Sequence, residues 1–170
     1  MLIRRELPHD SAAVHAVTCA AFARSDGTPA EATLVTELRA DPAWIPQLSL
    51  VALDSDGTVV GHVLATRGQV GPVPVLGLGP LSVRPAHQRR GVGSALMHAI
   101  LGAADAMDEP LVALLGNPVY YQRFGFGPCV DHHIAPPVAE WRPHFQVRPL
   151  TTYDPEIRGT FTYAEPFDRV

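Results

Sequence analysis

The stretch "VRPAHQRRGVGSALMHAI", residues 83–100, decides how the rest of this chain is interpreted. Apolar residues recur in it at helical spacing and continue downstream, so we predict a helix from Gly91 to about Asp108. No Ser, Thr, Asp or Asn stands just ahead of Gly91 to cap the free N–H groups of the first turn. Arg89 and Arg90 stand there instead, at the positive end of the helix dipole, where cations are disfavoured. The pattern predicts a helix start that an anion, brought by a ligand, completes.

The glycines at this helix start favour the same interpretation. Gly91 and Gly93 carry no side chain that would block the backbone, and the N–H groups of residues 91–94 point out of the first turn. A bound diphosphate would offset the conflict between the arginines and the dipole, about 0.3–1 kcal/mol for each charge. The alternative interpretation is a flexible, glycine-containing turn that binds no ligand, next to two solvated arginines.

Two common phosphate-binding motifs do not fit this stretch. A P-loop needs Gly-Lys-Ser/Thr, and the chain contains no lysine. A dinucleotide-binding fingerprint needs a third glycine where Leu96 stands, and its glycine turn directly follows a strand. Residues 84–89 separate the predicted strand from the loop here. Nicotinamide cofactors are therefore not expected.

Length and composition indicate an ordinary globular protein. The 170 residues fit one domain over 1–170, with 46% hydrophobic and 18% charged residues. The net charge of −4 argues against a nucleic-acid binder, and the absence of lysine excludes Schiff-base chemistry. Cys19 and Cys129 form no disulfide framework or metal set, and Cys19 is expected to be a small core residue. Because neither a signal peptide nor a long apolar run is present, a cytoplasmic location is expected and a membrane partner is not.

Hydrophobic periodicity and turn residues predict the remaining elements. The order β-α-α-β-β-β-α-β-α-β-β indicates an α/β (α+β) fold, a mixed central sheet with helices on both faces. Pro80 marks an irregularity in the strand that precedes the 91–108 helix, and Asn117 with Pro118 opens a short helix. Strands are expected at 2–7, 75–83, 111–116 and 144–150, a hairpin at 48–66, and further helices at 9–23, 29–41 and 118–125.

Two motifs in this order carry a family resemblance. Residues 88–93, "QRRGVG", resemble the Q/R-x-x-G-x-G/A pyrophosphate loop of the GNAT superfamily of N-acetyltransferases. Residues 117–126, "NPVYYQRFGF", resemble the later helix of that superfamily, which ends in Tyr-x-x-x-Gly-Phe. The stretches "GPLSVRP" and "YYQRFGF" are most similar to its YhbS-like subgroup of acyltransferases.

The resemblance implies a GNAT fold that binds acetyl-CoA as cosubstrate. Strands 75–83 and 111–116 would splay apart to admit the pantetheine arm and the thioester. Backbone groups of Leu81, Ser82 and Val83 would pair with that arm. Asn117 would cap its helix, contact the cosubstrate, or both. The pyrophosphate would be bound by Gln88, Arg89, Arg90, Gly91, Val92, Gly93 and Ser94.

Tyr121 stands where the family places the tyrosine that protonates the departing thiolate. A phenol with a pKa near 10 stays protonated at neutral pH and can donate its proton as charge develops. The alternative is an aromatic core residue, as expected for Tyr120 or Phe124.

The general base is not evident, because strand 75–83 contains no Asp or Glu, unlike many family members. His62 is a candidate base, and Glu31 is a candidate for holding a substrate ammonium group. Their simpler alternatives, which we favour, are a hydrogen-bonded strand histidine and a solvated first-turn acid, with a water chain removing the proton.

No metal is expected. His132 and His133 are adjacent, and neighbours on a strand point to opposite faces, so the pair would not chelate one ion. The predicted reaction is direct transfer of an acetyl group to an amine of a small molecule or peptide. Two alternatives stay open: a non-catalytic CoA-binding or sensor module, and an acyltransferase that uses a longer acyl-CoA. The apolar, proline-rich tail could form a homodimer contact.

Overall fold

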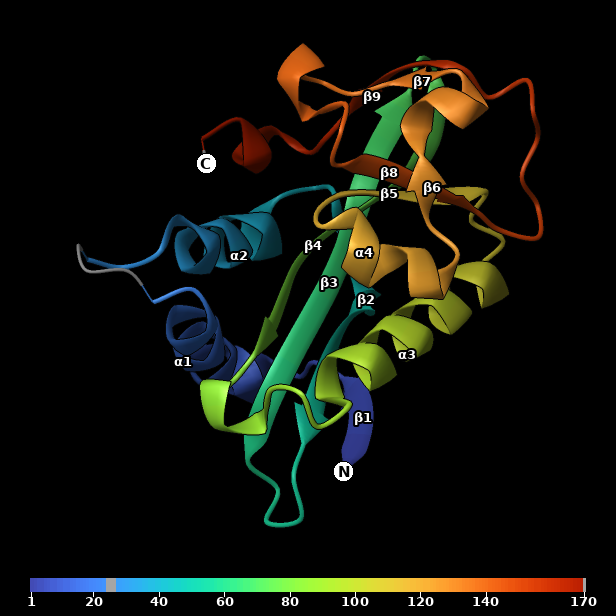
Figure 1. Ribbon diagram of the computed structural model, residues 1–170. Coiled ribbons are helices and arrows are strands. Elements are labelled where there is room, and N and C mark those ends of the chain that lie inside the picture. The colour runs from blue at the N-terminus through green and yellow to red at the C-terminus, as the bar shows by residue number, and fades with distance from the viewer. Residues whose placement is uncertain (24–26, 170) are drawn as a thin grey trace.

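The hairpin predicted at 48–66 forms two neighbouring strands inside the sheet, between its first and fourth strands. A computed structural model describes residues 1–23 and 27–169 (Figure 1). The helices are α1 (Ser11–Ala21), α2 (Ala30–Ala40), α3 (Val92–Ala106) and α4 (Pro118–Tyr121). The strands are β1 (Leu2–Arg5), β2 (Trp44–Leu53), β3 (Val59–Val70), β4 (Val73–Val83), β5 (Leu111–Leu115), β6 (Gly127–Pro128), β7 (Ile134–Ala135), β8 (Phe145–Pro149) and β9 (Gly159–Thr162). The predicted order of main helices and strands is confirmed.

The sheet is mixed, as predicted. Its strand order is β1-β2-β3-β4-β5-β8-β6, and β4 with β5 is the parallel pair within this order. β2, β3 and β4 form a long antiparallel meander, in which alternating side chains face opposite sides of the sheet.

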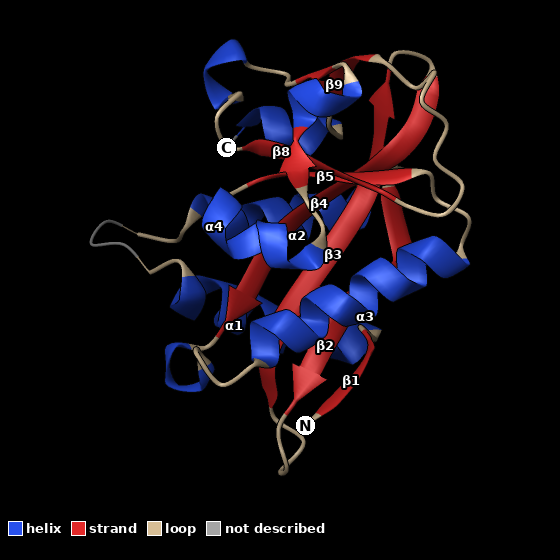
Figure 2. Ribbon diagram, turned by 45° about the vertical axis from the view of Figure 1, so that its right-hand side comes forward, coloured by secondary structure: helices blue, strands red, loops and turns tan. Residues whose placement is uncertain are grey.

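Helices cover both faces of this sheet (Figure 2). The apolar side of α3 packs on one face, where Leu96 and Ile100 share a buried cluster with Val63. α1 and α2 pack on the other face, where Leu38 shares a second cluster with Leu64. Each such side chain contributes about 1.5–3 kcal/mol of burial free energy, so the sheet is held from both sides.

The sheet opens between β4 and β5. These strands pair only at Leu76–Val112 and Gly77–Ala113, whereas the pairing of β4 with β3 continues to Val83. Residues 78–83 of β4 therefore have one edge that β5 does not cover. The predicted divergence of the two strands is confirmed, and Pro80, which follows a cis peptide bond, lies within it.

The C-terminal segment returns across the face that carries α1 and α2. β8 pairs with β5, and β9 pairs with β3 at Gln69–Thr162 and Val70–Phe161. Short 3₁₀ turns connect these strands, including Ala139–Trp141 and Glu165–Arg169. The strand expected at 144–150 is confirmed as β8, and the segment brings new aromatic side chains to the opening between β4 and β5.

Candidate active site

The start of α3 is uncapped. Its N-cap, Gly91, has φ +84° in the left-handed region that favours glycine, and no side chain caps the helix. The first intrahelical bond runs from the Ala95 N–H to the Gly91 carbonyl, at 2.9 Å. The N–H groups of residues 92–94 therefore precede the hydrogen-bonded part of the helix and point along its positive end.

A cavity of about 590 Å³ lies in front of this helix start, and we call it the loop cavity. The Arg123 guanidinium lies 4.7 Å from the centre of the Tyr120 ring, so that charge is held over an aromatic face in the cavity wall. No acidic side chain is among the described residues that line it, so the cavity favours an anion. Its lining comprises Ala21, Phe22, Leu81, Val83, Gln88, Arg89, Gly91, Gly93, Ser94, Tyr120 and Arg123.

Three residues expected at this site have side chains that lie elsewhere, although the contacts expected of Ser82 and Val92 are through their backbone groups. Arg90 is exposed outside the loop cavity, and Val92 is buried in the core beneath α3. The Ser82 hydroxyl lies on the opposite face of the sheet, where it donates to the Thr18 hydroxyl at 3.3 Å. Successive side chains of a strand point to opposite faces of the sheet. Leu81 and Val83 of β4 face the cavity, so Ser82 between them faces away from it.

Two polar side chains fix the backbone around the loop cavity. The Gln88 amide donates to the Val83 carbonyl at 3.1 Å and ties the loop to the end of β4. The Asn117 side chain accepts from the Val119 N–H at 3.0 Å and caps α4. Asn117 lines neither of the cavities described here, so capping is the role that its geometry gives.

A second cavity, of about 390 Å³, lies at the opening between β4 and β5, and we call it the aromatic cavity. Phe22 and Leu81 line both cavities, so the two meet at the opening. Glu31 is the one charged side chain among the described lining residues. The lining comprises Phe22, Glu31, Leu34, Leu78, Gly79, Pro80, Leu81, Leu115, Tyr121, Trp141, Tyr163 and Phe167.

Tyr121 is a protonated hydrogen-bond donor in the wall of the aromatic cavity. Burial raises its pKa to about 12, and the neighbouring Tyr120 acts in the same direction. The two rings meet edge to face, with centroids 4.9 Å apart. Burial also raises the pKa of Tyr163. Both phenols are neutral at physiological pH.

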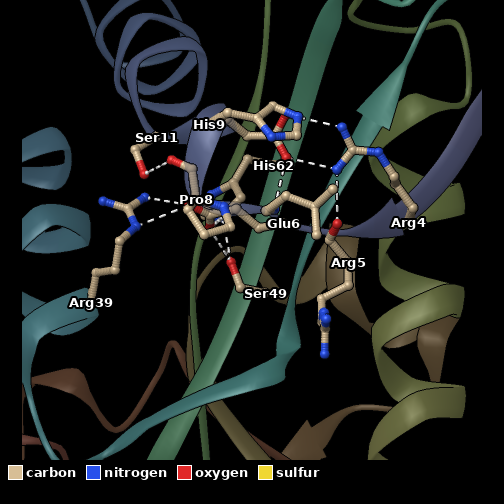
Figure 3. Close-up of polar contacts among 11 residues, drawn as sticks. Arg4, Arg5, Glu6, Pro8, His9, Ser11, Arg39, Ser49 and His62 are labelled. Carbon is tan, nitrogen blue, oxygen red and sulfur yellow. Dashed lines mark hydrogen bonds and ion pairs between the residues drawn. The ribbon is translucent and has the colours of Figure 1, made fainter.

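Of the two further candidates, Glu31 lines the aromatic cavity, as Tyr121 does, and His62 lies elsewhere. The His62 ring is fully buried, with its Nε2 2.9 Å from the Ser49 hydroxyl and 3.3 Å from a Glu6 carboxylate oxygen (Figure 3). His62 lines neither cavity and belongs to a polar group inside the sheet, so it is the hydrogen-bonded strand histidine that we favoured and not the candidate base.

This buried polar group carries a single negative charge balanced by an arginine. Arg39 donates two hydrogen bonds to one Glu6 oxygen, at 2.9 and 2.7 Å, and the Ser49 hydroxyl donates to the other oxygen at 2.5 Å. Burial lowers the pKa of His62, although the hydrogen bond to Glu6 opposes this. Burial raises the pKa of Glu6, but hydrogen bonds from His62 and Ser49 outweigh it, so the net shift is downward. A neutral His62 with its proton on Nε2 can donate to the Ser49 hydroxyl, which donates to Glu6, while the buried Nδ1 of His62 has no hydrogen-bond partner among the described residues.

The adjacent histidines do not lie on a strand. His132 ends the 3₁₀ turn Cys129–His132 and His133 follows with φ +54°, so the strand geometry that we expected for them is wrong. Among the described residues, no group of three or more His, Cys, Asp or Glu side chains is arranged to hold a metal. Both cysteines are free thiols, and Cys19 is partly exposed rather than a core residue. None of the helices in the described ranges has the length and apolar character needed to cross a bilayer.

Comparison with known proteins identifies the family. The family model described as "Acetyltransferase (GNAT) domain" matches residues 3–129. The chain is 31% identical over 172 residues to the uncharacterized N-acetyltransferase YhbS of Escherichia coli K12, covering 99% of each. The chain belongs to the GNAT family of acetyltransferases. The resemblance inferred from the loop and the tyrosine helix is confirmed.

Solved structures agree with the GNAT assignment over nearly the whole chain. The crystal structure of Escherichia coli YhbS in complex with CoA superposes with a TM-score of 0.90 at 31% identity, covering 99% of this chain and 92% of that one. A GNAT acetyltransferase from Brucella melitensis in complex with acetyl-CoA has a TM-score of 0.80 at 34% identity, covering 98% and 97%. The predicted GNAT fold is therefore confirmed.

Several residues that line the two cavities were not predicted from the sequence. Arg123 could have been found, because on a helix it lies three residues from Tyr120 and therefore on the same side. Trp141, Tyr163 and Phe167 could not, because the turns and the short strand β9 that bring them to the aromatic cavity have no periodic signal.

Proposed function

We propose that this chain, as one catalytic unit over 1–170, transfers the acetyl group of acetyl-CoA directly to an amine. The observation that carries the proposal is the meeting of two unlike cavities at the opening between β4 and β5. One presents an uncapped helix start and arginines, and the other is lined by a protonated tyrosine and a carboxylate. The CoA and acetyl-CoA bound to the two relatives support this assignment.

The loop cavity suits the diphosphate and the pantetheine arm of the cosubstrate. The N–H groups of residues 92–94 and the Arg89 guanidinium would bind the diphosphate, because both offer positive potential in one place. Gln88 would hold the loop in position against β4. The edge of residues 78–83 that β5 leaves uncovered would pair with amide groups of the arm, as an added strand does.

The reaction needs a neutral amine. A lysine-like amine with a pKa of about 10.4 is neutral in only about one molecule in a thousand near pH 7.4, so its proton must first leave. We assign the orientation of the ammonium group to Glu31 and the removal of its proton to water at the cavity mouth. The nitrogen lone pair then forms the N–C bond to the thioester carbon as the C–S bond breaks, with the bonding pair leaving on sulfur.

Tyr121 would relay the remaining proton. Its hydroxyl protonates the departing thiolate, and the phenolate regains the proton that the nitrogen loses on becoming an amide. A phenol with a pKa of about 12 is a weaker acid than a thiol, so both transfers must occur together. The products are the acetylated amine and CoA thiol, with one proton released to water.

A thiol-release assay with product analysis tests this function. We expect CoA thiol and an amide heavier by one acetyl group to form in equal amounts, only when an amine is present. The Tyr121→Phe variant should lower kcat by about a hundredfold or more while acetyl-CoA binding stays unchanged. Binding of acetyl-CoA without transfer to any amine would favour a sensor module, and faster release from a longer acyl-CoA would favour that alternative.

A further inference from the structure

The ring of Tyr121 lies directly against the backbone of Gly116, the residue that follows β5. A Cβ built on Gly116 would lie 2.9 Å from Cδ2 of that ring and would overlap its Cε2. The φ of Gly116 lies outside the left-handed region, so the backbone conformation at this position would accept a side chain. It is therefore the ring of Tyr121, and not the conformation of the chain, that requires glycine at position 116.

Strand β8 and the residue before it bind both polar groups of the Gly116 backbone. The Gly116 N–H donates to the His144 carbonyl at 2.9 Å, and the Gln146 side-chain amide donates to the Gly116 carbonyl at 3.0 Å. The nitrogen of the same amide lies 3.4 Å from the His144 carbonyl, so Gln146 bridges the two chain segments. Its side chain is buried, and its backbone pairs with Leu114 of β5. The backbone beneath the ring is thus fixed from inside the sheet.

The helix that carries Tyr121 gives the ring little support of its own. α4 has four residues, and a single helical turn is not stable without tertiary contacts. The Tyr121 N–H donates to the Asn117 carbonyl at 3.1 Å, which fixes the backbone but not the ring. The rings of Tyr120 and Phe126 meet that of Tyr121 edge to face, with centroids 4.9 and 6.0 Å away. The orientation of the phenol therefore depends on packing, and Gly116 provides the closest surface.

We propose that Gly116 and Gln146 are positioning residues for acetyl transfer, which together set the place of the Tyr121 hydroxyl in the aromatic cavity. This rests on the proposed function, in which that hydroxyl protonates the departing thiolate. Gly116 leaves the space that the ring fills, and Gln146 holds the Gly116 backbone in the position that this packing needs. Neither is among the described lining residues of the two cavities, so both act through Tyr121. Proton transfer depends steeply on geometry, and a misplacement of about 1 Å can lower a rate about a hundredfold.

Substitutions at the two positions test this role. Gly116→Ala places a methyl group where the ring lies, and Gln146→Met removes the hydrogen-bond donor at a similar side-chain volume. Turnover would be measured as thiol release at saturating acetyl-CoA, with an equimolar mixture of 2-phenylethylamine, spermidine and lysine as acceptors. We expect each variant to lower turnover by at least about tenfold, because the proton donor is misplaced. Acetyl-CoA affinity, measured by calorimetry, should stay within about twofold of wild type, because the loop cavity is unchanged.

The same substitutions in a Tyr121→Phe background separate positioning from a general structural effect. Where the proton donor is already absent, displacing the ring removes nothing more, so each substitution should change turnover by less than about twofold there. Equal fold losses in both backgrounds would overturn the positioning role. Turnover within about twofold of wild type in either single variant would also overturn it. Gln146→Met carries the comparison by itself if Gly116→Ala does not fold.

The matched control variants are Gly102→Ala and Gln69→Met, the same chemical changes at exposed positions that line neither cavity. A Cβ at Gly102 would meet no described atom within 4 Å. Both variants should keep wild-type turnover and acetyl-CoA affinity. Absence of thiol release from the wild-type protein would overturn the proposed function, and full turnover in Tyr121→Phe would overturn its proton donor. These failures are therefore distinguishable from failure of the positioning role.

Discussion

The Tyr120 hydroxyl occupies the space that a side chain at Gly93 would need. A Cβ built on Gly93 would lie 2.9 Å from that oxygen, closer than such atoms approach in proteins. The ring of Tyr120 is held by Tyr121, Phe124 and Arg123, so the hydroxyl has little freedom to move away. Gly93 thus lets α4 pack against the start of α3, and this packing places Tyr120 and Arg123 in the wall of the loop cavity.

Gly93→Ala should therefore destabilise the protein despite the higher helix propensity of alanine. Overpacking costs about 1–3 kcal/mol and offsets the gain of up to about 1 kcal/mol from propensity. Removing the Tyr120 hydroxyl should relieve the conflict, so Gly93→Ala should cost less in a Tyr120→Phe background. Urea unfolding of the four proteins should give a coupling free energy of about 1 kcal/mol. Additive effects would show that the contact does not constrain position 93.

The two arginines of the loop should contribute unequally to CoA binding. Arg89 lines the loop cavity, whereas Arg90 does not. We expect Arg89→Ala to weaken CoA binding by more than about tenfold, because a charge-assisted contact is lost, and Arg90→Ala to weaken it by less than about threefold. Calorimetric titration of CoA into both variants checks this. Equal losses of CoA affinity in the two variants would mean that the exposed Arg90 contributes as much to binding as Arg89, which lines the cavity.

The pH dependence of turnover should reflect the raised pKa of Tyr121. Because its pKa is about 12 rather than about 10, the hydroxyl stays protonated throughout the alkaline range in which the amine loses its proton. We expect kcat/KM to rise with pH as the amine deprotonates and to show no falling limb below about pH 10. Rates measured in overlapping buffers, with folding checked by circular dichroism, test this. A falling limb below about pH 10 that disappears in Tyr121→Phe would contradict the assigned pKa.

The buried His62 should make stability depend on pH on the acid side. Its pKa is lower in the folded protein than in the unfolded chain, so the unfolded chain binds the proton first as the pH falls. Its contribution is fully present above the unfolded pKa of about 6.5 and is lost as the pH falls toward the folded value.

Urea unfolding at about pH 7.5 and about pH 5.5 measures this loss. We expect a smaller difference between the two conditions in His62→Gln, which keeps a donor for Ser49. His144→Gln, at an exposed position, is the matched control and should behave like wild type. An unchanged difference in His62→Gln would show that the histidine does not cause the acid-side loss.

Elements with strong local signals could be predicted from the sequence. The periodic apolar face of α3, the Ser-Asp-Gly turn between β2 and β3, and the Asn117 cap each depend on residues near one another in the chain. The opening between β4 and β5 was expected from the family resemblance, with Pro80 as a local sign.

Features that depend on contacts between distant residues could not be predicted. The polar group inside the sheet joins Glu6, Arg39, Ser49 and His62, which no local pattern links. The proline-rich tail has no periodicity, so the pairing of β9 with β3, which carries Tyr163 to the aromatic cavity, has no sequence signal. Tertiary packing alone decides these positions.

The measurement that most directly tests acetyl transfer at this site is a calorimetric titration of acetyl-CoA into the wild-type protein, followed by addition of a mixture of primary amines to the same complex. We predict a one-to-one complex that releases CoA thiol only after the amines are added. Absence of acetyl-CoA binding would mean that the helix start at Gly91 is not a cosubstrate site, and the assignment of acetyl transfer to the two cavities would be contradicted.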